Sequence, residues 1–446
     1  MSVSTPPPPV AMPPYWPRQV RINRPDARNA PALPAQDIDF PARGRAVGYF
    51  GISAAAKASQ YDAMTQPPEI SIDLAEFAAD PYPTYARLRR DAPIAFVPEL
   101  GAVLMTRRAH IAEYEKRVDL FSSVQPDGLM TLLMGENMMR KDGPPHLAER
   151  KAMFPTISPR TARDHWMGAF RDRAQVLIAE LQPRGSADIL KDFAMPMAGE
   201  ALKLMTGLTH VAASDIDRWS QAMIDGIANY AGDPAVETAC HRATAEIDAA
   251  VATAPGDDPL SLIETQKAAG MAATQVALNV RLAISGGQNE TRDAMTGLLW
   301  ALLAHPEQLD MLSRGSRSFH DAFDEYVRWM APIGMSPRRI ARDCTIDGID
   351  LNAGGRMFFM FAAANRDETV WPDAEVFDIT RDASRHIGFG AGPHFCAGAP
   401  AAKTLIADVA VPLLLAGLPG LSLAGPVDFH GWAFRGPAAL PVVWRA

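Results

Sequence analysis

Apolar side chains recur at helical spacing over one long segment of the chain, from Gln275 to His305. At 1.5 Å per residue, a helix of about thirty residues spans roughly 45 Å, which is enough to cross a large domain. A polar stretch with two adjacent glycines, Gly286 and Gly287, interrupts the pattern. Each glycine in a helix costs about 1 kcal/mol relative to alanine, so the stretch predicts a kink or bulge with room for a ligand. Close helix packing at the glycines is the alternative interpretation.

Shorter patterns predict small sheets beside the helices. Prolines precede an amphipathic pattern over Thr84–Arg90, which predicts a helix. The apolar runs Ile94–Val97 and Ala102–Thr106 flank Gly101 and predict two short paired strands. Residues 160–265 carry helical patterns without identifiable chemistry. The sequence therefore predicts a mainly α-helical protein with small β-sheets.

The first part of the chain differs in composition from the rest. Its first 43 residues contain eleven prolines, which favour extended, solvated chain over packing. We therefore predict a largely disordered extension over residues 1–71, with a short docked helix at Arg43–Met64 as an option. An incidental tail is favoured over a functional segment. No linker, repeat or composition shift divides residues 72–446, so these are predicted to form one large domain.

Charge and cysteine usage exclude several classes of protein. The formal net charge is −8 with both signs scattered along the chain, which argues against a nucleic-acid partner. Cys240, Cys344 and Cys396 are too far apart in sequence for a disulfide framework or a zinc pattern. No apolar run has the length of a membrane span, and the N-terminus lacks the apolar segment of a secretory signal. A reducing, cytoplasmic location without a membrane partner is the prediction.

One cysteine stands in a distinctive setting. It belongs to the stretch Phe389-Gly390-Ala391-Gly392-Pro393-His394-Phe395-Cys396-Ala397-Gly398, a glycine-rich hairpin followed by an apolar helix. Glycines let the backbone pass close beneath a flat cofactor, and a helix N-terminus stabilises a thiolate. The pattern predicts that Cys396 ligates a haem iron. A surface glycine loop with a buried free cysteine is the alternative.

Two further motifs agree with that interpretation. Glu325-Tyr326-Val327-Arg328 precedes the cysteine by about seventy residues, and Ala364–Asp367 and Phe377–Arg381 lie between them. With the cysteine hairpin, they resemble the Glu-x-x-Arg helix, the meander and the ligand loop of cytochrome P450 enzymes of the soluble bacterial type. The resemblance extends roughly from Ile72 to Ala446. It implies a monooxygenase that binds haem b (iron protoporphyrin IX) between the long helix and the cysteine loop.

The resemblance also implies partners for the haem propionates, since buried carboxylates need charge-assisted hydrogen bonds. His146 and Arg150 are four residues apart, so they share one helix face. Arg338, His386 and His394 match the other propionate positions of the family. Ordinary packed, hydrogen-bonded histidines are the alternative for the three imidazoles. Gly287 of the long helix is expected to line the cofactor.

The same long helix carries the expected proton-delivery residues. Counting back from His305-Pro306 without a gap places Asn289 and Glu290 at the family's acid and threonine positions. A one-residue bulge would instead place Glu290 and Thr291 there, and the sequence alone does not decide. We favour the ungapped register, in which a carboxylate replaces the alcohol. Such a glutamate can act as a general acid or base, so we predict that the enzyme tolerates or uses H₂O₂ besides O₂.

Other segments narrow the expected substrate. Asp80–Ala102 and His430–Trp444, with the amide–glutamate pair, are similar to bacterial aromatic O-demethylases of the guaiacol type. The resemblance implies demethylation of a methoxylated, guaiacol- or syringol-like aromatic to a phenol and formaldehyde. Phe434 matches the turn that projects a side chain into the pocket, although a core phenylalanine is the alternative. Hydroxylation of another small apolar molecule, such as a terpenoid, is the second prediction. A haem-binding protein without turnover is the third.

The stretch expected to cover the pocket is rich in methionine. Met130, Met134 and Met138 lie in the irregular stretch 121–138, where the family's loop covers the pocket; they either adapt to ligands or fill the core.

No flavin or iron–sulfur pattern accompanies the haem motifs. Unless peroxide replaces O₂, electrons come from separate proteins. The resemblance implies a ferredoxin- or flavodoxin-type donor and its reductase, with Arg381 and Arg385 as candidate docking residues.

Overall fold

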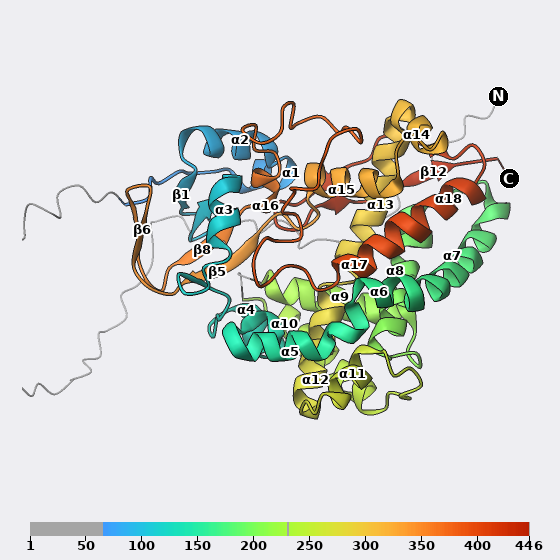
Figure 1. Ribbon diagram of the computed structural model, residues 1–446, viewed down its shortest axis with the longest axis horizontal. Coiled ribbons are helices and arrows are strands. Elements are labelled where there is room, and N and C mark those ends of the chain that lie inside the picture. The colour runs from blue at the N-terminus through green and yellow to red at the C-terminus, as the bar shows by residue number, and fades with distance from the viewer. Residues whose placement is uncertain (1–65, 230–231, 446) are drawn as a thin grey trace, which may run out of the picture. The chain divides into compact units, whose positions relative to one another are not determined.

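The computed structural model describes residues 66–229 and 232–445 (Figure 1). Contacts divide the chain into two units, Met1–Thr65 and Gln66–Ala446, and all the described residues belong to the second. The helix predicted at Arg43–Met64 lies outside the described residues. Pairing in the second unit begins ahead of the boundary predicted at residue 72, because the Ile70 N–H donates to the Phe96 carbonyl (2.9 Å).

Eighteen α-helices in the described residues make up most of the unit, in agreement with the predicted fold class. Those of the first half are α1 (Leu74–Ala79), α2 (Tyr82–Asp91), α3 (Arg108–Tyr114), α4 (Leu129–Met134), α5 (Gly143–Ile157), α6 (Pro159–Thr161), α7 (Met167–Leu181), α8 (Met195–Thr206) and α9 (Ala213–Ile227). Those of the second half are α10 (Pro234–Ala252), α11 (Leu262–Ala268), α12 (Ala273–Ser285), α13 (Asn289–Ala304), α14 (Pro306–Ser313), α15 (Phe319–Met330), α16 (Phe361–Ala364), α17 (Ala399–Lys403) and α18 (Val411–Gly417).

Short helical segments of other types extend several of these helices. Single 3-10 turns lie at Met138–Arg140 and Gln182–Arg184, and π-helical segments lie at Ala162–Trp166, Leu190–Ala194 and Thr404–Ala410. The last π-helical segment joins α17 to α18 in one stretch, Ala399–Gly417, which is long and apolar enough to cross a membrane. Its most apolar window is 56% buried inside the fold, and a core helix meets the same criteria.

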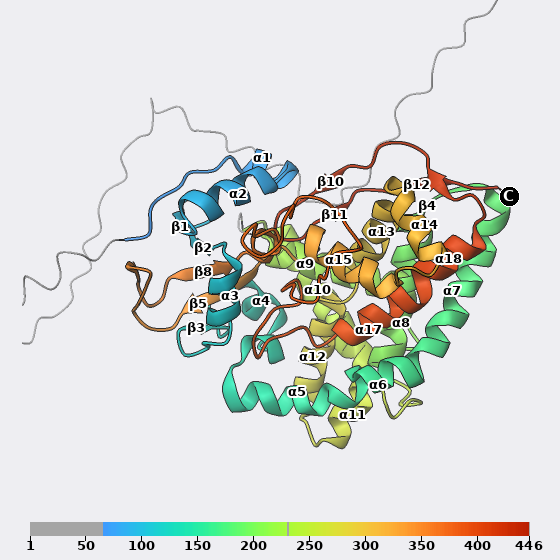
Figure 2. The ribbon, with the colours of Figure 1, turned by 45° about the horizontal axis from the view of Figure 1, so that its top comes forward.

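The strands form four small sheets. They are β1 (Ile94–Val97), β2 (Ala102–Met105), β3 (Phe121–Ser122), β4 (Ser186–Asp188), β5 (Ser336–Ile340), β6 (Cys344–Ile346), β7 (Ile349–Leu351), β8 (Arg356–Phe359), β9 (Ser422–Leu423), β10 (Phe429–His430), β11 (Gly436–Pro437) and β12 (Pro441–Val443). The largest has the order β1-β2-β8-β5-β3, and only its β2–β8 pair is parallel. As predicted, β1 and β2 pair in antiparallel fashion, with Val97 opposite Ala102. This sheet lies beside α1–α3, on the side of the unit away from α7 and α18 (Figures 1 and 2).

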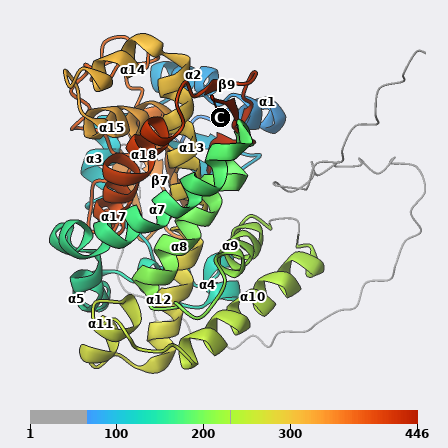
Figure 3. The same ribbon diagram turned by 90° about the vertical axis from the view of Figure 1, so that its right-hand side faces the viewer.

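The predicted long helix is present as two helices, α12 and α13, with the break at Gly286–Gln288. α13 is central, since it contacts α8, α9, α14, α15 and β11. Two separate apolar clusters meet at the break: α13 and α15 contribute to one, while α4, α9, α10 and α12 contribute to the other. Figure 3 shows the second group of helices below α13 and α15. The break therefore lies where the two cores adjoin.

Local sequence explains the helix that carries the Glu-x-x-Arg motif. The Ser318 hydroxyl accepts from the Asp321 N–H, and the Asp321 carboxylate accepts from the Ser318 N–H, which completes a capping box at the start of α15. One face of α15 then carries Phe323, Tyr326 and Val327 into the core. The opposite end brings Glu325 and Arg328 against the segment that precedes the cysteine hairpin.

Candidate functional site

The cysteine hairpin folds as its glycines predict. The Cys396 N–H donates to the Phe389 carbonyl (2.8 Å), which closes the hairpin. Gly390 has a φ of +83°, a conformation that disfavours side chains. A Cβ on Gly392 would lie 2.4 Å from the carbonyl oxygen of Glu115, so only glycine fits there. The hairpin is thus held tightly against the end of α3.

Cys396 is enclosed by the fold. Burial is the largest influence on its thiol pKa, which it raises. The N–H groups of Gly398 and Ala399 at the start of α17, and the Arg150 guanidinium, lower the same pKa. These groups stabilise a thiolate at this position.

Glu290 is an acidic side chain near Cys396. Its carboxylate raises the pKa of Cys396, so the two groups are close enough to interact. Burial raises the pKa of Glu290 itself to about 7, with a further increase from Asp293 and an opposing effect of Arg292. Its Oε2 has no hydrogen-bond partner among the described residues. Glu290 is therefore a carboxyl group with an unused polar atom, opposite the thiol.

The other two residues considered for proton delivery lie differently. The Asn289 amide donates to Gln221 of α9 (3.4 Å), and its oxygen accepts from Arg292 (3.3 Å). Asn289 is thus engaged with α9, while Thr291 follows Glu290 in the first turn of α13 and is half-buried. Of these three residues, Glu290 is therefore the acidic one that lies near Cys396.

The two glycines of the break face different surroundings. A Cβ on Gly287 would come within 2.5 Å of the Ala283 carbonyl and 2.8 Å of the Leu202 side chain on α8. A Cβ on Gly286 would meet only the Leu282 carbonyl, at 3.4 Å. Close packing against Leu202 of α8 requires a glycine at position 287, as the helix-packing alternative predicts. Open space lies next to Gly286 instead.

Basic side chains gather beside the hairpin from three different elements. His146 of α5 and His394 of the hairpin have ring centroids 4.2 Å apart, and His394 Nε2 lies 2.8 Å from an Asp142 oxygen. Burial, assisted by His394 and Arg150, lowers the pKa of His146 to about 4. Arg338 of β5 is buried and lowers the pKa of His394, as does the buried Arg140. The residues predicted as propionate partners on α5 and β5 are thus close to His394.

Several polar atoms of this cluster are left for a ligand. His146 Nε2 and Arg338 Nε are buried without a hydrogen-bond partner in the described part of the chain. Unpaired buried donors are costly, and carboxylates are their natural acceptors. Within residues 66–229 and 232–445, no group of three or more His, Cys, Asp or Glu side chains could hold a metal ion. A metal bound by Cys396 must therefore bring its other ligands with it, as iron in a porphyrin with two carboxylates does.

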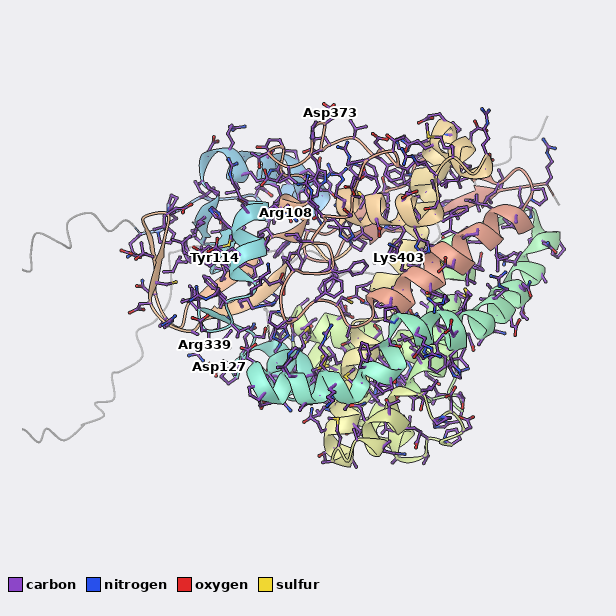
Figure 4. All side chains as sticks on the ribbon, viewed as in Figure 1. Arg108, Tyr114, Asp127, Arg339, Asp373 and Lys403 are labelled. Carbon is purple, nitrogen blue, oxygen red and sulfur yellow. The ribbon has the colours of Figure 1, made fainter. Side chains whose placement is uncertain are left out.

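Two predicted roles are corrected by the structure. His386 is not in the propionate cluster: its ring packs on Phe389, and Asp324 and Lys403 are among the charges that act on it (Figure 4 labels Lys403). Burial lowers its pKa to about 4. Arg381 is not available for docking, because its guanidinium donates to the Pro372 and Asp373 carbonyls. Arg385 is exposed.

Two residues near the hairpin carry little signal in the sequence and were not predicted. Arg140 is followed directly by Lys141 and Asp142, so the local pattern resembles that of an exposed charged turn. Glu115 follows α3, and nothing in the local pattern distinguishes it from an exposed glutamate. The structure buries both of them.

The Glu-x-x-Arg motif forms a buried ion pair that organises the proximal side. Arg328 donates two hydrogen bonds to Glu325, of 2.7 and 2.8 Å, and both side chains are fully buried. Arg328 also donates to the carbonyls of Asn365 and Ala374, while Glu325 accepts from the Asp378 N–H. The motif therefore fixes the meander that leads into the cysteine hairpin.

The residues predicted to line the substrate pocket differ in how deeply they are buried. Met130, Met134 and Met138 are buried in the second apolar cluster, which is the core-filling alternative. Phe434 is half-buried and pairs with Ile333 through an isolated β-bridge.

A helical fold in which an enclosed cysteine lies near basic side chains with unpaired buried polar atoms fits a haem-thiolate protein. The comparisons agree with this class. A family model described as Cytochrome P450 matches residues 320–414. Cytochrome P450 monooxygenase PikC of Streptomyces venezuelae is 29% identical over 395 residues, which cover 83% of this chain and 92% of that protein.

Two further relatives extend the comparison. The 6-deoxyerythronolide B hydroxylase of Saccharopolyspora erythraea is 30% identical over 410 residues, which cover 85% of this chain and 99% of that protein. The structure of cytochrome P450 260B1 from Sorangium cellulosum So Ce56 matches with a TM-score of 0.74 and 25% identity, covering 85% of this chain and 100% of that one. The chain belongs to the cytochrome P450 family. It is a monooxygenase of the bacterial type with haem b as its cofactor.

Proposed function

We propose that this P450 removes the methyl group of a methoxylated aromatic related to guaiacol or syringol. The products are the phenol and formaldehyde, and one atom of O₂ leaves as water after two electrons and two protons have been supplied. Oxidation of the methoxy carbon gives a hemiacetal, which collapses without further help from the protein. Hydroxylation of a different apolar molecule is the second candidate, because one relative is named as a hydroxylase of 6-deoxyerythronolide B.

The C-terminal turn that contains Phe434 is the feature that supports an aromatic substrate. Phe434 keeps a partly exposed side chain next to Ile333. Two residues later, a Cβ on Gly436 would lie 2.4 Å from the Asp293 carboxyl carbon, so the turn is closely packed on α13. Asp293 is on the same helix face as Glu290, three residues on. An aromatic side chain near the acid supports binding of a planar ring through edge or stacked contacts.

The haem would be held by Cys396 and by His146, Arg150, Arg338, His394 and Arg140, and it would supply the oxygen-activating chemistry of the family. The chain's own contribution is proton handling on the distal side. Glu290, with a pKa near 7, can hold or release a proton at neutral pH. The Asn289 amide has no ionisable proton and is occupied by Gln221. Glu290 therefore takes the role that an acid–alcohol pair has in the usual family pattern.

The same carboxylate supports use of peroxide. An ionised Glu290 can remove a proton from H₂O₂ and orient it, which a threonine hydroxyl does poorly. We accordingly propose that H₂O₂ can replace O₂ and the electron donor. With O₂, electrons come from a separate ferredoxin- or flavodoxin-type donor, for which the exposed Arg385 is a candidate contact. The cytoplasm is the compartment that we propose.

Ligand titration of the purified ferric protein tests the substrate class. We expect guaiacol, syringol or 4-methoxybenzoate to convert the haem from low to high spin in a saturable manner, and formaldehyde to form in proportion to the phenol. Spectral shifts with a terpenoid panel and none with methoxyarenes would overturn the demethylase assignment in favour of hydroxylation.

The Phe434→Ala variant sharpens this test. Loss of one aromatic contact should weaken methoxyarene binding by about 1 kcal/mol, or roughly fivefold in Kd. Binding of a saturated terpenoid should change less. Val443→Ala, at an exposed position of the same C-terminal region, is the control. Equal weakening of both ligand classes would remove Phe434 from the specificity determinants.

A further inference from the structure

Glu115 is a buried carboxylate that the proposed substrate chemistry does not use. It follows α3 directly, after Tyr114, which Figure 4 labels. Its side chain is only 2% exposed, although glutamate is rarely buried without a partner. Burial raises its pKa, whereas the Arg338 guanidinium and a backbone N–H lower it. A buried acid at this position therefore requires an explanation.

Two contacts join Glu115 to two different parts of the haem site. Its Oε2 accepts a short hydrogen bond from the Ala391 N–H, within the cysteine hairpin. Its Oε1 accepts from Nη2 of Arg338, at 3.2 Å. Arg338 comes from β5, more than two hundred residues further along the chain. The carboxylate thus links the loop that carries the ligand cysteine to an arginine of the carboxylate-binding cluster.

The hairpin is shaped around this carboxylate. A Cβ on Gly390 would lie 3.0 Å from Glu115 Oε1, and one on Gly392 would lie 2.4 Å from the Glu115 carbonyl oxygen. Arg338 has no other acidic partner among the described residues within salt-bridge distance. Glu115 is therefore the acid in direct contact with Arg338, with a further electrostatic effect from Asp142.

We propose that Glu115 is a positioning residue that sets the reduction potential of the haem. Its carboxylate offsets the Arg338 cation and holds Ala391 beneath the cofactor. Reduction adds one electron to the iron, from a separate donor protein, and a nearby negative charge opposes that step. The charge thus keeps the potential low, independently of which substrate the enzyme accepts.

Redox titration of the holoprotein tests the proposal, with dithionite as reductant and mediator dyes. Glu115→Gln keeps an acceptor for the Ala391 N–H and removes the charge. We expect the one-electron equilibrium to shift about tenfold toward the reduced form, which is about 59 mV more positive. The absorption spectrum of the reduced carbonyl complex should stay that of a thiolate-ligated haem. Glu115→Asp, which keeps the charge, should stay closer to the wild-type potential.

Glu149→Gln is the matched control. Glu149 is similarly buried and accepts from Lys141, Gln275 and Asn279, but it contacts neither the hairpin nor Arg338. An unchanged potential in Glu115→Gln, or an equal shift in Glu149→Gln, would overturn the proposal. Glu115→Leu provides the same measurement if the glutamine variant loses haem. If both lose haem while Glu149→Gln retains it, the role of Glu115 is purely structural and the proposal fails.

Discussion

We call the side of the haem site that carries the Glu325–Arg328 pair proximal and the side that carries Glu290 distal. The buried charges on these two sides differ in how completely they are hydrogen-bonded. On the proximal side, Arg328 donates to both oxygens of Glu325 and to backbone carbonyls of the meander. On the distal side, Glu290 keeps an oxygen without a hydrogen-bond partner among the described residues. The Glu325–Arg328 pair is fully hydrogen-bonded, whereas Glu290 retains a polar atom that is available for chemistry.

From this difference we expect the Glu325–Arg328 pair to contribute mainly to stability and Glu290 to contribute mainly to reactivity. A fully satisfied buried pair costs much to break, because the remaining partner becomes an uncompensated charge. An unsatisfied buried carboxyl costs free energy in the resting protein and is retained where it has a task. Substitutions on the two sides should accordingly affect different observables.

Replacing the ligand cysteine should have the largest effect. In Cys396→Ser, loss of the thiolate should lower turnover by about three orders of magnitude, roughly 4 kcal/mol in the activation barrier. Product formation and the spectrum of the reduced carbonyl complex provide the measurements. Cys344→Ser, at a distant hairpin, should retain both. A fully active Cys396→Ser enzyme would contradict the assignment of the ligand.

Glu325→Ala tests the hydrogen-bonded Glu325–Arg328 pair. It leaves the Arg328 charge buried, so the free energy of unfolding should fall by about 3–5 kcal/mol. Denaturant unfolding of the holoprotein measures this change. Asp164→Ala breaks an exposed pair with Arg163 and should cost less than about 1 kcal/mol. Similar costs for the two variants would remove the contrast between the sides.

Glu290→Gln tests the carboxyl group that keeps an oxygen without a hydrogen-bond partner among the described residues. Peroxide-supported turnover should fall by about 100-fold, within the usual range for a lost general base, while the free energy of unfolding should not fall. Because burial raises the pKa of Glu290 to about 7 and the base is the ionised form, the wild-type rate should rise as pH increases through 7. The variant should lack this rise. An unchanged peroxide rate in Glu290→Gln would refute the proposed role.

The smallest effect is expected for His386→Ala. Since His386 packs on Phe389 and is away from the His146–His394 pair, haem affinity should change by less than about twofold. Haem transfer to apomyoglobin measures the affinity. His394→Ala should weaken it several-fold. Equal weakening by the two variants would return His386 to the carboxylate-binding cluster.

The predictable parts of the site are those set by local sequence. The turn geometry of the hairpin needs glycine at defined positions, so Cys396 could be found from its setting. Glu325 and Arg328 could be found because, together with the meander and the cysteine hairpin, they match the motifs of the family. The direction of a loop side chain depends on its neighbours in space, and for that reason His386 was misplaced.

Contacts between distant segments could not be predicted. Glu115 meets Arg338 and Ala391 only after α3, β5 and the hairpin have been packed together. The role of Gly287 depends on Leu202 of α8 in the same way. A glycine pair at a helix break is compatible with both a ligand and a neighbouring helix, and the pattern along the chain contains no information on which lies there.

The close packing of Gly436 on Asp293 has a consequence for how the enzyme can diversify. The turn that carries Phe434 rests on an acid that raises the pKa of Glu290. A mutation that reshapes this turn for a new substrate therefore also displaces a charge beside the proton-transfer group. Under the roles proposed for Phe434 and Glu290, substrate range and oxidant preference would be inherited together, and a lineage that changes one would need compensating changes in the other.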